Sequence, residues 1–350
     1  MTLAATEPLQ NLLDHRAAQP GPPARFVARV ELGRSGQTWT ASAGMAEHGD
    51  EHGALRIASI TKSFVAAAVL RLVEQGRLAL DDALPAFLRP HSLALLRTGG
   101  YRCESICLRM LLDHTSGIGD FATPEIFAER VLKDPRHRWT REEQLALAMQ
   151  QPREGAPGAR YVYCDTNYIL LGEALEVITD LPMPQAVRTL LDLPALGLRH
   201  TWFETLEPAP PAAPARFAQH YASSNLVESF DASIDLYGAG GQLSTLHDLA
   251  LFFRALLRGA VLTQPRTLAL MCAPSPQSLA AGGIPYGLGL ETLRVGNVEC
   301  WGHTGYWGVA AWHCPARDVT VTAAVSDTAR KDDLRALTHD LIARAAGDLG

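Results

Sequence analysis

One short stretch of this sequence combines a nucleophile with a group that could activate it. In Ser59-Ile60-Thr61-Lys62 a hydroxyl and an amine stand three residues apart at the beginning of an apolar, helix-like segment. Residues i and i+3 share a helix face, so the Lys62 amine can reach the Ser59 oxygen. A serine attacks a carbonyl only when a neighbour takes its proton. Only three of the 31 basic residues are lysines, which favours a specific role for Lys62.

Two further stretches contain side chains suited to proton transfer and substrate binding. Tyr163 precedes a polar Cys-Asp-Thr-Asn run and an apolar segment, and a phenol can relay protons during catalysis. The alternative is a core tyrosine that is hydrogen-bonded at its tip. His303-Thr304-Gly305 ends a predicted strand, where Gly305 would allow a substrate or another backbone to approach closely. The alternative there is a simple turn between two strands.

The elements that must position these residues follow from hydrophobic periodicity and turn residues. Alternation predicts strands near both ends of the chain, and the spacing of apolar residues predicts helices around them. We expect strands at 24–32 and 37–44, a helix over 57–76 that Ser59 or a neighbour could cap, a helix over 240–259 capped by Ser244 or Thr245, an antiparallel meander over 286–326 and a helix over 334–346.

The order of these elements predicts an α/β (α+β) fold. Strands from both chain ends would form one antiparallel sheet flanked by terminal helices, with an inserted all-helical lobe packed against it. We expect a single catalytic domain over 1–350, in which approximately 20–90 and 240–350 form the sheet lobe and approximately 91–239 the helical lobe.

The ordered set of motifs resembles the penicillin-recognising serine hydrolases, in the branch with class C β-lactamases, DD-peptidases, D-aminopeptidases and esterases. Ser59-Ile60-Thr61-Lys62 is similar to the S-x-x-K of that family, Tyr163-Cys164-Asp165 to its Tyr-x-Asn and His303-Thr304-Gly305 to its Lys/His-Thr-Gly. LLDHTSGI, YGAGGQLSTLHDLALF and YGLGLE agree with it, and the resemblance extends from about residue 25 to 345. It implies a β-lactamase/transpeptidase-like fold.

The resemblance also implies a role for each motif residue. Ser59 would be the nucleophile, Lys62 its activating partner and Tyr163 the shared acid and base. His303 and Thr304 would help to dock the substrate, and the backbone N–H groups of Ser59 and Tyr306, the residue after Gly305, would form the oxyanion hole. No cofactor and no metal are implied.

Two departures from the family pattern bear on the substrate. Asp165 stands where Asn is usual, and an ionised Asp cannot donate a hydrogen bond to a substrate carbonyl. It would stabilise a protonated Lys62 or repel an acidic substrate. His303 replaces a lysine and would be only partly charged at neutral pH. Both favour an esterase, amidase or acyltransferase over an efficient β-lactamase, while a D-amino-acid peptidase and a weak β-lactamase stay as alternatives.

Other functions fit the sequence less well. His48-Gly49-Asp50-Glu51-His52 fits H-x-x-E-H, but its glycines and its place in a polar loop speak against a zinc helix. No G-x-S-x-G is present. A non-catalytic binding module of the same fold stays an alternative, although it need not retain Ser59, Lys62 and Tyr163. Trp301, Trp307 and Trp312 are expected to line an acyl pocket or to pack in the core.

Composition excludes several partner classes. The net charge is -6, and the sequence contains no run of basic residues that could bind a phosphate backbone. Nucleic acid is therefore not expected as a partner. No stretch has the roughly 20 apolar residues of a membrane helix, and the N-terminus lacks the pattern of a signal peptide. We therefore expect a cytoplasmic protein acting on a small ester, amide or peptide. The six cysteines show no framework spacing and are expected to be reduced.

Overall fold

A six-stranded antiparallel sheet joins the two ends of the chain in the computed structural model, which describes residues 3–45 and 51–347. The strand order is β2-β1-β11-β10-β9-β8. Phe26 of β1 pairs with Val325 of β11, so the N-terminal hairpin extends the C-terminal meander. The strands are β1 (Arg25–Leu32), β2 (Gln37–Gly44), β8 (Glu291–Val295), β9 (Val298–Gly305), β10 (Val309–Cys314) and β11 (Val319–Val325).

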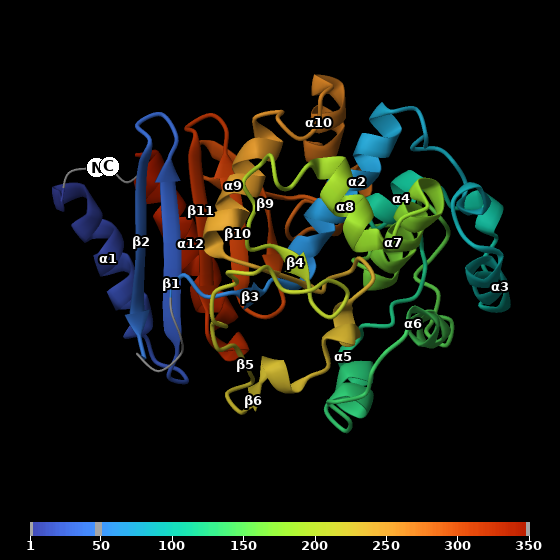
Figure 1. Ribbon diagram of the computed structural model, residues 1–350, viewed down its shortest axis with the longest axis horizontal. Helices are drawn as coiled ribbons and strands as arrows, with labels where there is room; N and C mark the ends of the chain where they lie inside the picture. Colours follow the sequence, from blue (N-terminus) through green and yellow to red (C-terminus); the bar gives the residue numbers. More distant parts are fainter. Residues whose placement is uncertain (1–2, 46–50, 348–350) are drawn as a thin grey trace.

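Helices cover both faces of this sheet (Figure 1). The terminal helices α1 (Leu3–Ala17) and α12 (Lys331–Ala346) pack together on one face, and α9 (Leu246–Leu257) packs on the other. Side chains alternate along a strand, so β1 places Phe26 in the core under α1 and α12 and Val27 in the core on the α9 side. The chain ends thereby complete the fold.

The remaining helices form the part of the molecule beside the sheet, on the right in Figure 1. Its centre is α2 (Thr61–Glu74), whose residues 61–70 are all buried and which packs against α7 and α8. Being apolar nearly all round, α2 can hold a polar side chain in a dry environment. The other helices here are α3 (Pro90–Thr98), α4 (Leu108–Leu112), α5 (Pro124–Ile126), a π-helical turn (Phe127–Val131), α6 (Arg141–Ala148), α7 (Asp165–Thr179) and α8 (Met183–Leu191).

Short elements connect the two parts. The two-residue strands β3 (Leu55–Arg56) and β4 (Trp202–Phe203) both pair with β7 (Gln242–Ser244), and β5 (His220–Tyr221) pairs with β6 (Asn225–Leu226). The helices α10 (Pro265–Cys272) and α11 (Pro276–Ala281) precede β8. Because β3 leads directly into the Ser59 turn, this small sheet fixes where α2 begins.

The predicted architecture is confirmed, with differences at some element ends. The segment 91–239 is not all-helical as predicted, because it contains the short strands β4, β5 and β6. The segment 240–259 opens as β7 and becomes helical only at Leu246, where the Thr245 side chain accepts a hydrogen bond from Asp248 N–H. The last helix begins at Lys331, three residues earlier than predicted. No side chain caps α2, because the 3₁₀ turn Ala58–Ile60 runs straight into it.

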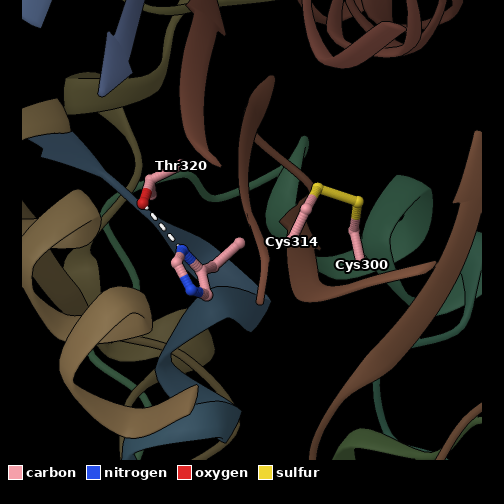
Figure 2. Close-up of a disulfide and its surroundings, with 4 residues drawn as sticks. Cys300, Cys314 and Thr320 are labelled. Carbon is pink, nitrogen blue, oxygen red and sulfur yellow. Dashed lines mark hydrogen bonds between the residues drawn. A yellow bond between two sulfur atoms is a disulfide. The ribbon is translucent and has the colours of Figure 1, made fainter. Parts of the chain in front are cut away.

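The expectation of reduced cysteines is wrong for two of the six. Cys300 and Cys314 form a disulfide between β9 and β10, with Cα atoms 4.2 Å apart (Figure 2). They are directly opposite each other, next to the His313–Trp301 pair, and both are fully buried. Facing positions on antiparallel strands come this close, a relation that a separation of 14 residues in sequence does not reveal. Cys103, Cys107, Cys164 and Cys272 are free thiols.

Within residues 3–45 and 51–347, no helix combines the length and the apolar character required to cross a membrane.

Candidate active site

Ser59 lies in the 3₁₀ turn that opens α2, where the backbone is unusually constrained. Ala58 has a φ of 46°, a left-handed conformation that costs a residue other than glycine about 1 kcal/mol or more. The end of β9 lies in close contact with the backbone that leads into this turn, because a Cβ on Gly305 would stand 2.3 Å from the Ile57 carbonyl oxygen. Gly305 is thus needed for close approach to another backbone. The contact brings the residue after β9, Tyr306, beside the Ser59 turn.

Lys62 is the most completely enclosed charged residue of the site. Its side chain is 0% exposed, and its amine is surrounded by three oxygens. Nζ lies 3.0 Å from Ser59 Oγ, 2.7 Å from the Ala239 carbonyl oxygen and 2.5 Å from Asp165 Oδ1. The first two contacts are hydrogen bonds donated by Nζ, and the third is an ion pair with the carboxylate. The amine also lies 5.0 Å from the ring centre of Tyr163.

Asp165 reaches this amine from the first turn of α7. Its side chain is 22% exposed, so the ion pair is open to solvent on one side only. The position that departs from the family pattern therefore forms a direct contact with Lys62, the first of the two effects expected of Asp165.

Tyr163 occupies the segment just before α7 and faces the same group of residues. Burial and the Asp165 carboxylate raise the pKa of its phenol well above the ordinary value, while the adjacent Ser59 hydroxyl lowers it. Tyr163 is therefore a neutral phenol in the resting enzyme, able to donate a proton.

The His303 motif is held by a second polar group behind Ser59. His303 Nε2 is 3.1 Å from the Tyr286 hydroxyl, and the Thr304 N–H and hydroxyl donate to Glu291 at 3.1 and 3.0 Å. Burial and the Lys62 charge lower the pKa of His303 to about 3. Burial raises the pKa of Glu291 to about 7, against the hydrogen bonds from Thr304. His303 is thus neutral at physiological pH, whereas the sequence suggested a partial charge.

Two cavities meet at Ser59, and Ser59, Tyr163 and Tyr306 line both. The smaller, of about 270 Å³, lies toward the helical part of the molecule. Its walls are largely apolar and aromatic, and they carry the carboxyl groups of Asp120, Asp165 and Asp235. The apolar and aromatic wall residues are Ala58, Phe121, Ala122, Pro124, Ile126, Phe127, Val131, Ile234, Ala239 and Trp307. We call it the acidic cavity.

The larger cavity, of about 440 Å³, lies between the sheet edge and α12. It is lined by His303, Thr304 and Gly305 and by charged side chains of both signs: Glu291, Lys331, Asp332 and Arg335. We call it the mixed cavity. Lys331 lies over the ring of Tyr306, 4.1 Å from its centre.

Of the three tryptophans noted in the sequence, Trp307 lines the acidic cavity and Trp312 lines the mixed cavity. Trp301 donates its indole N–H to the Cys272 carbonyl, and Trp312 is buried on the side of the terminal helices.

Several residues of the site were not singled out from the sequence. Asp120 and Asp235 come from separate loops, and no local pattern marks either. Burial raises the pKa of each carboxyl group to about 6. The Asp165 charge also raises the pKa of Asp120, whereas the Arg56 charge lowers that of Asp235. Tyr286 and Glu291 lie within or at the end of YGLGLE, which was noted only for its resemblance.

The zinc alternative gains no support from the structure. His48, Gly49 and Asp50 lie outside the described residues, and Glu51 and His52 form a turn. Over 3–45 and 51–347, no group of three or more His, Cys, Asp or Glu side chains is placed to hold a metal ion.

Comparison with known proteins identifies the family. The family model described as Beta-lactamase matches residues 9–345. The chain belongs to the Beta-lactamase family. Relatives within reach of sequence comparison include esterase EstB of Burkholderia gladioli, 33% identical over 45% of this chain and 41% of the esterase. A putative D-alanyl-D-alanine carboxypeptidase of Salmonella paratyphi A is 22% identical over 72% of this chain and 64% of that protein. The aligned part thus spans less than two thirds of either curated relative.

Solved structures of the family agree over almost the whole chain. A D-stereospecific amidohydrolase from Streptomyces sp. has a TM-score of 0.81 and 29% identity, covering 96% of this chain and 98% of its own. A penicillin-binding protein from Bacillus halodurans, at 20% identity and a TM-score of 0.73 over 95% and 98%, shares the fold. The predicted fold and family are confirmed.

Proposed function

We propose that the protein is a serine hydrolase that forms an acyl-enzyme on Ser59 and cleaves a small amide or ester. The observation that carries the proposal is the 3.0 Å contact between Lys62 Nζ and Ser59 Oγ at the junction of two cavities. A nucleophile needs a charged or basic neighbour, space for the acyl group and space for the leaving group, and these surround Ser59. Membership of a family with esterase and amidohydrolase relatives supports the same reaction.

The arrangement of donors suggests how the proton moves. Lys62 Nζ donates to Ser59 Oγ and to the Ala239 carbonyl oxygen, and its charge pairs with Asp165. To act as the base, Lys62 would first release a proton to solvent and become a neutral amine. Nζ would then take the Ser59 proton as Oγ bonds to the substrate carbonyl carbon. As the bond to the leaving group breaks, Tyr163 would give its phenol proton to the leaving amine or alkoxide and regain one from Lys62. The N–H groups of Ser59 and Tyr306 would stabilise the oxyanion of the tetrahedral intermediate.

The acidic cavity suggests the acyl part of the substrate. Its aromatic and aliphatic walls fit an apolar side chain, whereas Asp120 and Asp235 line it as carboxyl groups that burial makes costly to ionise. A substrate ammonium would offset that cost by pairing with them. We therefore infer an acyl donor with an α-amino group, such as an amino acid amide, ester or short peptide. The amidohydrolase relative of 29% identity is D-stereospecific, so the D-enantiomer is the first choice.

A substrate with a carboxylate in place of the ammonium is disfavoured. A carboxylate at that place would meet Asp120, Asp165 and Asp235, and the described lining of the acidic cavity has no Lys, Arg or His to pair with it. Weak β-lactamase activity and transfer of the acyl group to an amine or alcohol remain alternatives that use the same acyl-enzyme, and a non-catalytic binding module remains the alternative without turnover.

The proposal is tested with substrates that differ in one feature. D-Phenylalanine p-nitroanilide, its L-enantiomer, the p-nitroanilide of 3-phenylpropionic acid and nitrocefin are incubated with the wild type and with Ser59→Ala. We expect fastest release from the D-amino acid derivative and none by the variant. Equal turnover by Ser59→Ala would reject Ser59 as the nucleophile. Turnover of the phenylpropionyl compound at the rate of its amino analogue would reject the amino-acid substrate class.

The cellular compartment and the two-lobe boundaries stay proposals. We propose the cytoplasm, but the Cys300–Cys314 disulfide points the other way, because disulfides persist mainly in oxidising compartments. The number of reactive thiols distinguishes a reducing from an oxidising compartment, and it is measured by alkylating the denatured protein after isolation from its own cells without reductant. Six reactive thiols would support the cytoplasm, and four would oppose it. For the lobes, the proposal is approximately 20–90 with 240–350 for the sheet lobe and approximately 91–239 for the helical lobe. Helix α2, which these boundaries assign to the sheet lobe, packs against α7 and α8 of the helical lobe.

A further inference from the structure

His114 is a buried residue with a backbone conformation that histidine seldom adopts. It follows α4 in the stretch Asp113-His114-Thr115-Ser116-Gly117, is 1% exposed and has a φ of 59°. Left-handed backbone outside glycine costs free energy and persists only where the surroundings enforce it. The function proposed above gives His114 no role, so its strained position requires a separate explanation.

His114 forms hydrogen bonds with the residue before Tyr163 and with the residue after it. The His114 carbonyl oxygen accepts the N–H of Val162 at 3.0 Å, and its ring nitrogen Nδ1 accepts the N–H of Cys164 at 3.1 Å. The imidazole also contacts the Tyr163 ring, with 4.3 Å between ring centres. One residue thus fixes the backbone before Tyr163, the backbone after it and the ring itself. The left-handed backbone accompanies these three simultaneous contacts.

The imidazole is itself held in one state. Nδ1 lies 3.4 Å from the side-chain nitrogen of Asn167, whose oxygen accepts a hydrogen bond of 2.6 Å from the Ser116 hydroxyl. Because Nδ1 accepts the Cys164 N–H, the ring proton belongs on Nε2. Burial lowers the pKa of His114 well below its ordinary value, and the charge of Lys62 lowers it further. Because the ring is neutral and its tautomer is fixed, Nδ1 can accept the Cys164 N–H throughout the pH range around neutrality.

We propose that His114 is the positioning residue of Tyr163: it holds the segment Val162–Cys164 so that the phenol faces Ser59 and Lys62. This inference rests on the proposed proton transfer by Tyr163. The inference goes beyond the proposed function because it assigns the position of the Tyr163 phenol to a residue outside the three catalytic motifs. Since misplacement by about 1 Å can cost two orders of magnitude in rate, the effect should be large.

The test compares two replacements of His114 that both tolerate its backbone. Glycine adopts a positive φ without strain but provides neither ring nor acceptor. Asparagine is also found in this conformation and has Oδ1 in the place of Nδ1, so it keeps the bond from Cys164 N–H. We expect His114→Gly to lower kcat/KM about 100-fold and His114→Asn to stay within about 10-fold of the wild type. Millimolar imidazole should restore part of the activity of His114→Gly.

A double-mutant cycle shows whether the effect passes through Tyr163. In a Tyr163→Phe background, His114→Gly should change kcat/KM by less than about 3-fold. Should His114→Gly not fold, His114→Leu replaces it with the same expectation. The matched control is His313→Leu, at a histidine that is also fully buried and bonded to Thr320 at 2.9 Å. It should lower the Tm and leave kcat/KM within about 3-fold at a temperature where the protein is folded.

Two results would overturn the inference. One is a His114→Gly enzyme with more than about a third of wild-type kcat/KM. The other is a full 100-fold loss in the Tyr163→Phe background, which would mean that His114 acts elsewhere. Labelling of wild-type Ser59 by a fluorophosphonate is measured in the same samples. Its absence would reject the proposed function itself, whereas labelling with unaffected His114 variants would reject this inference alone.

Discussion

The two cavities that meet at Ser59 differ in the sign of their charged walls. The acidic cavity has Asp120, Asp165 and Asp235, and its lining includes no Lys, Arg or His among the described residues. The mixed cavity combines Lys331 and Arg335 with Glu291 and Asp332. One side of the nucleophile thus attracts positive charge, and the other has no strong preference. This asymmetry orients a substrate whose acyl group has an ammonium and whose leaving group is neutral or anionic.

The two sides also come from different parts of the fold. The acidic cavity is built from loops next to α5 and α7, together with the Asp235 loop, whereas the mixed cavity is built from β8, β9, β10 and α12 (Figure 1). Loops can change without disturbing the hydrogen-bonded sheet. If the proposed function holds, acyl specificity would lie mainly in the part that can vary, and catalysis would depend on the junction of β9 with the Ser59 turn.

The largest expected effect is at the junction that both cavities share. Lys62→Arg keeps the charge but cannot fit its larger, planar head among Ser59, Ala239 and Asp165 without moving them. We expect kcat/KM to fall by about 10³-fold or more for every substrate, because the nucleophile loses its partner. Steady-state kinetics at matched fold content, checked by circular dichroism, measure this. A rate within 10-fold of the wild type would show that Lys62 is not needed for proton transfer.

The next effect is confined to the acidic cavity. Asp235→Asn should lower kcat/KM for the D-phenylalanine derivative about 10- to 100-fold, the size of a lost hydrogen bond to a charged group. The phenylpropionyl analogue should be unaffected or improved. Asp113→Asn is the control, since Asp113 is also buried with a raised pKa but does not line either cavity. Equal losses for both substrates would indicate a structural role for Asp235.

The pH dependence of that preference has a defined direction. Burial raises the pKa values of Asp120 and Asp235 to about 6, so both are protonated below this pH and cannot pair with an ammonium. The ratio of kcat/KM for the amino substrate over its desamino analogue should therefore increase as the pH rises from 5 to 7. A ratio that stays constant over this range would exclude both carboxylates from amine binding.

A smaller effect concerns stability. A carboxyl group whose pKa is raised from 3.8 to about 6 by folding binds its proton more tightly in the native state, so stability decreases as the pH rises between these values. Asp235→Asn removes this cost. Its Tm should exceed that of the wild type by about 2–4 °C at pH 7.5 and should match it near pH 3.5. A lower Tm at pH 7.5 would mean that Asp235 is already paired favourably.

The smallest effect is expected in the mixed cavity. The Arg335 side chain is 70% exposed and lies 3.9 Å from Asp332, so solvent screens its charge. Arg335→Met should change kcat/KM less than about 5-fold, whether the leaving group is neutral or has a carboxylate. A loss above 20-fold confined to the carboxylate-bearing leaving group would show that this cavity is selective after all.

Sequence reasoning recovered the parts of the molecule that local patterns encode. The alternation in 24–32 and 318–326 marks buried strands, and Ser59 and Lys62 are three residues apart, so their contact depends on one helical turn only. Tyr163 and His303 were found because their motifs occur in the order of a known family. Their placement needs the whole fold.

The remainder depends on contacts between distant segments. Asp120 and Asp235 are separated by more than a hundred residues, and they line the same cavity only through the tertiary fold. Likewise, Cys300 faces Cys314 through strand register, which a one-residue slip would abolish. His114 lay within a noted motif, but its role depends on backbone bonds to residues 162 and 164 that no side-chain pattern predicts.

The most direct test of the account is covalent capture of the nucleophile. The wild type and Ser59→Ala are incubated with a fluorophosphonate and, separately, with a penicillin, and intact and peptide masses are recorded. We predict a single adduct with the phosphonate on the peptide that contains Ser59, little or none with the penicillin, and no adduct on Ser59→Ala. An adduct on a different peptide, or an unlabelled but folded wild-type protein, would contradict the proposal that Ser59 forms an acyl-enzyme.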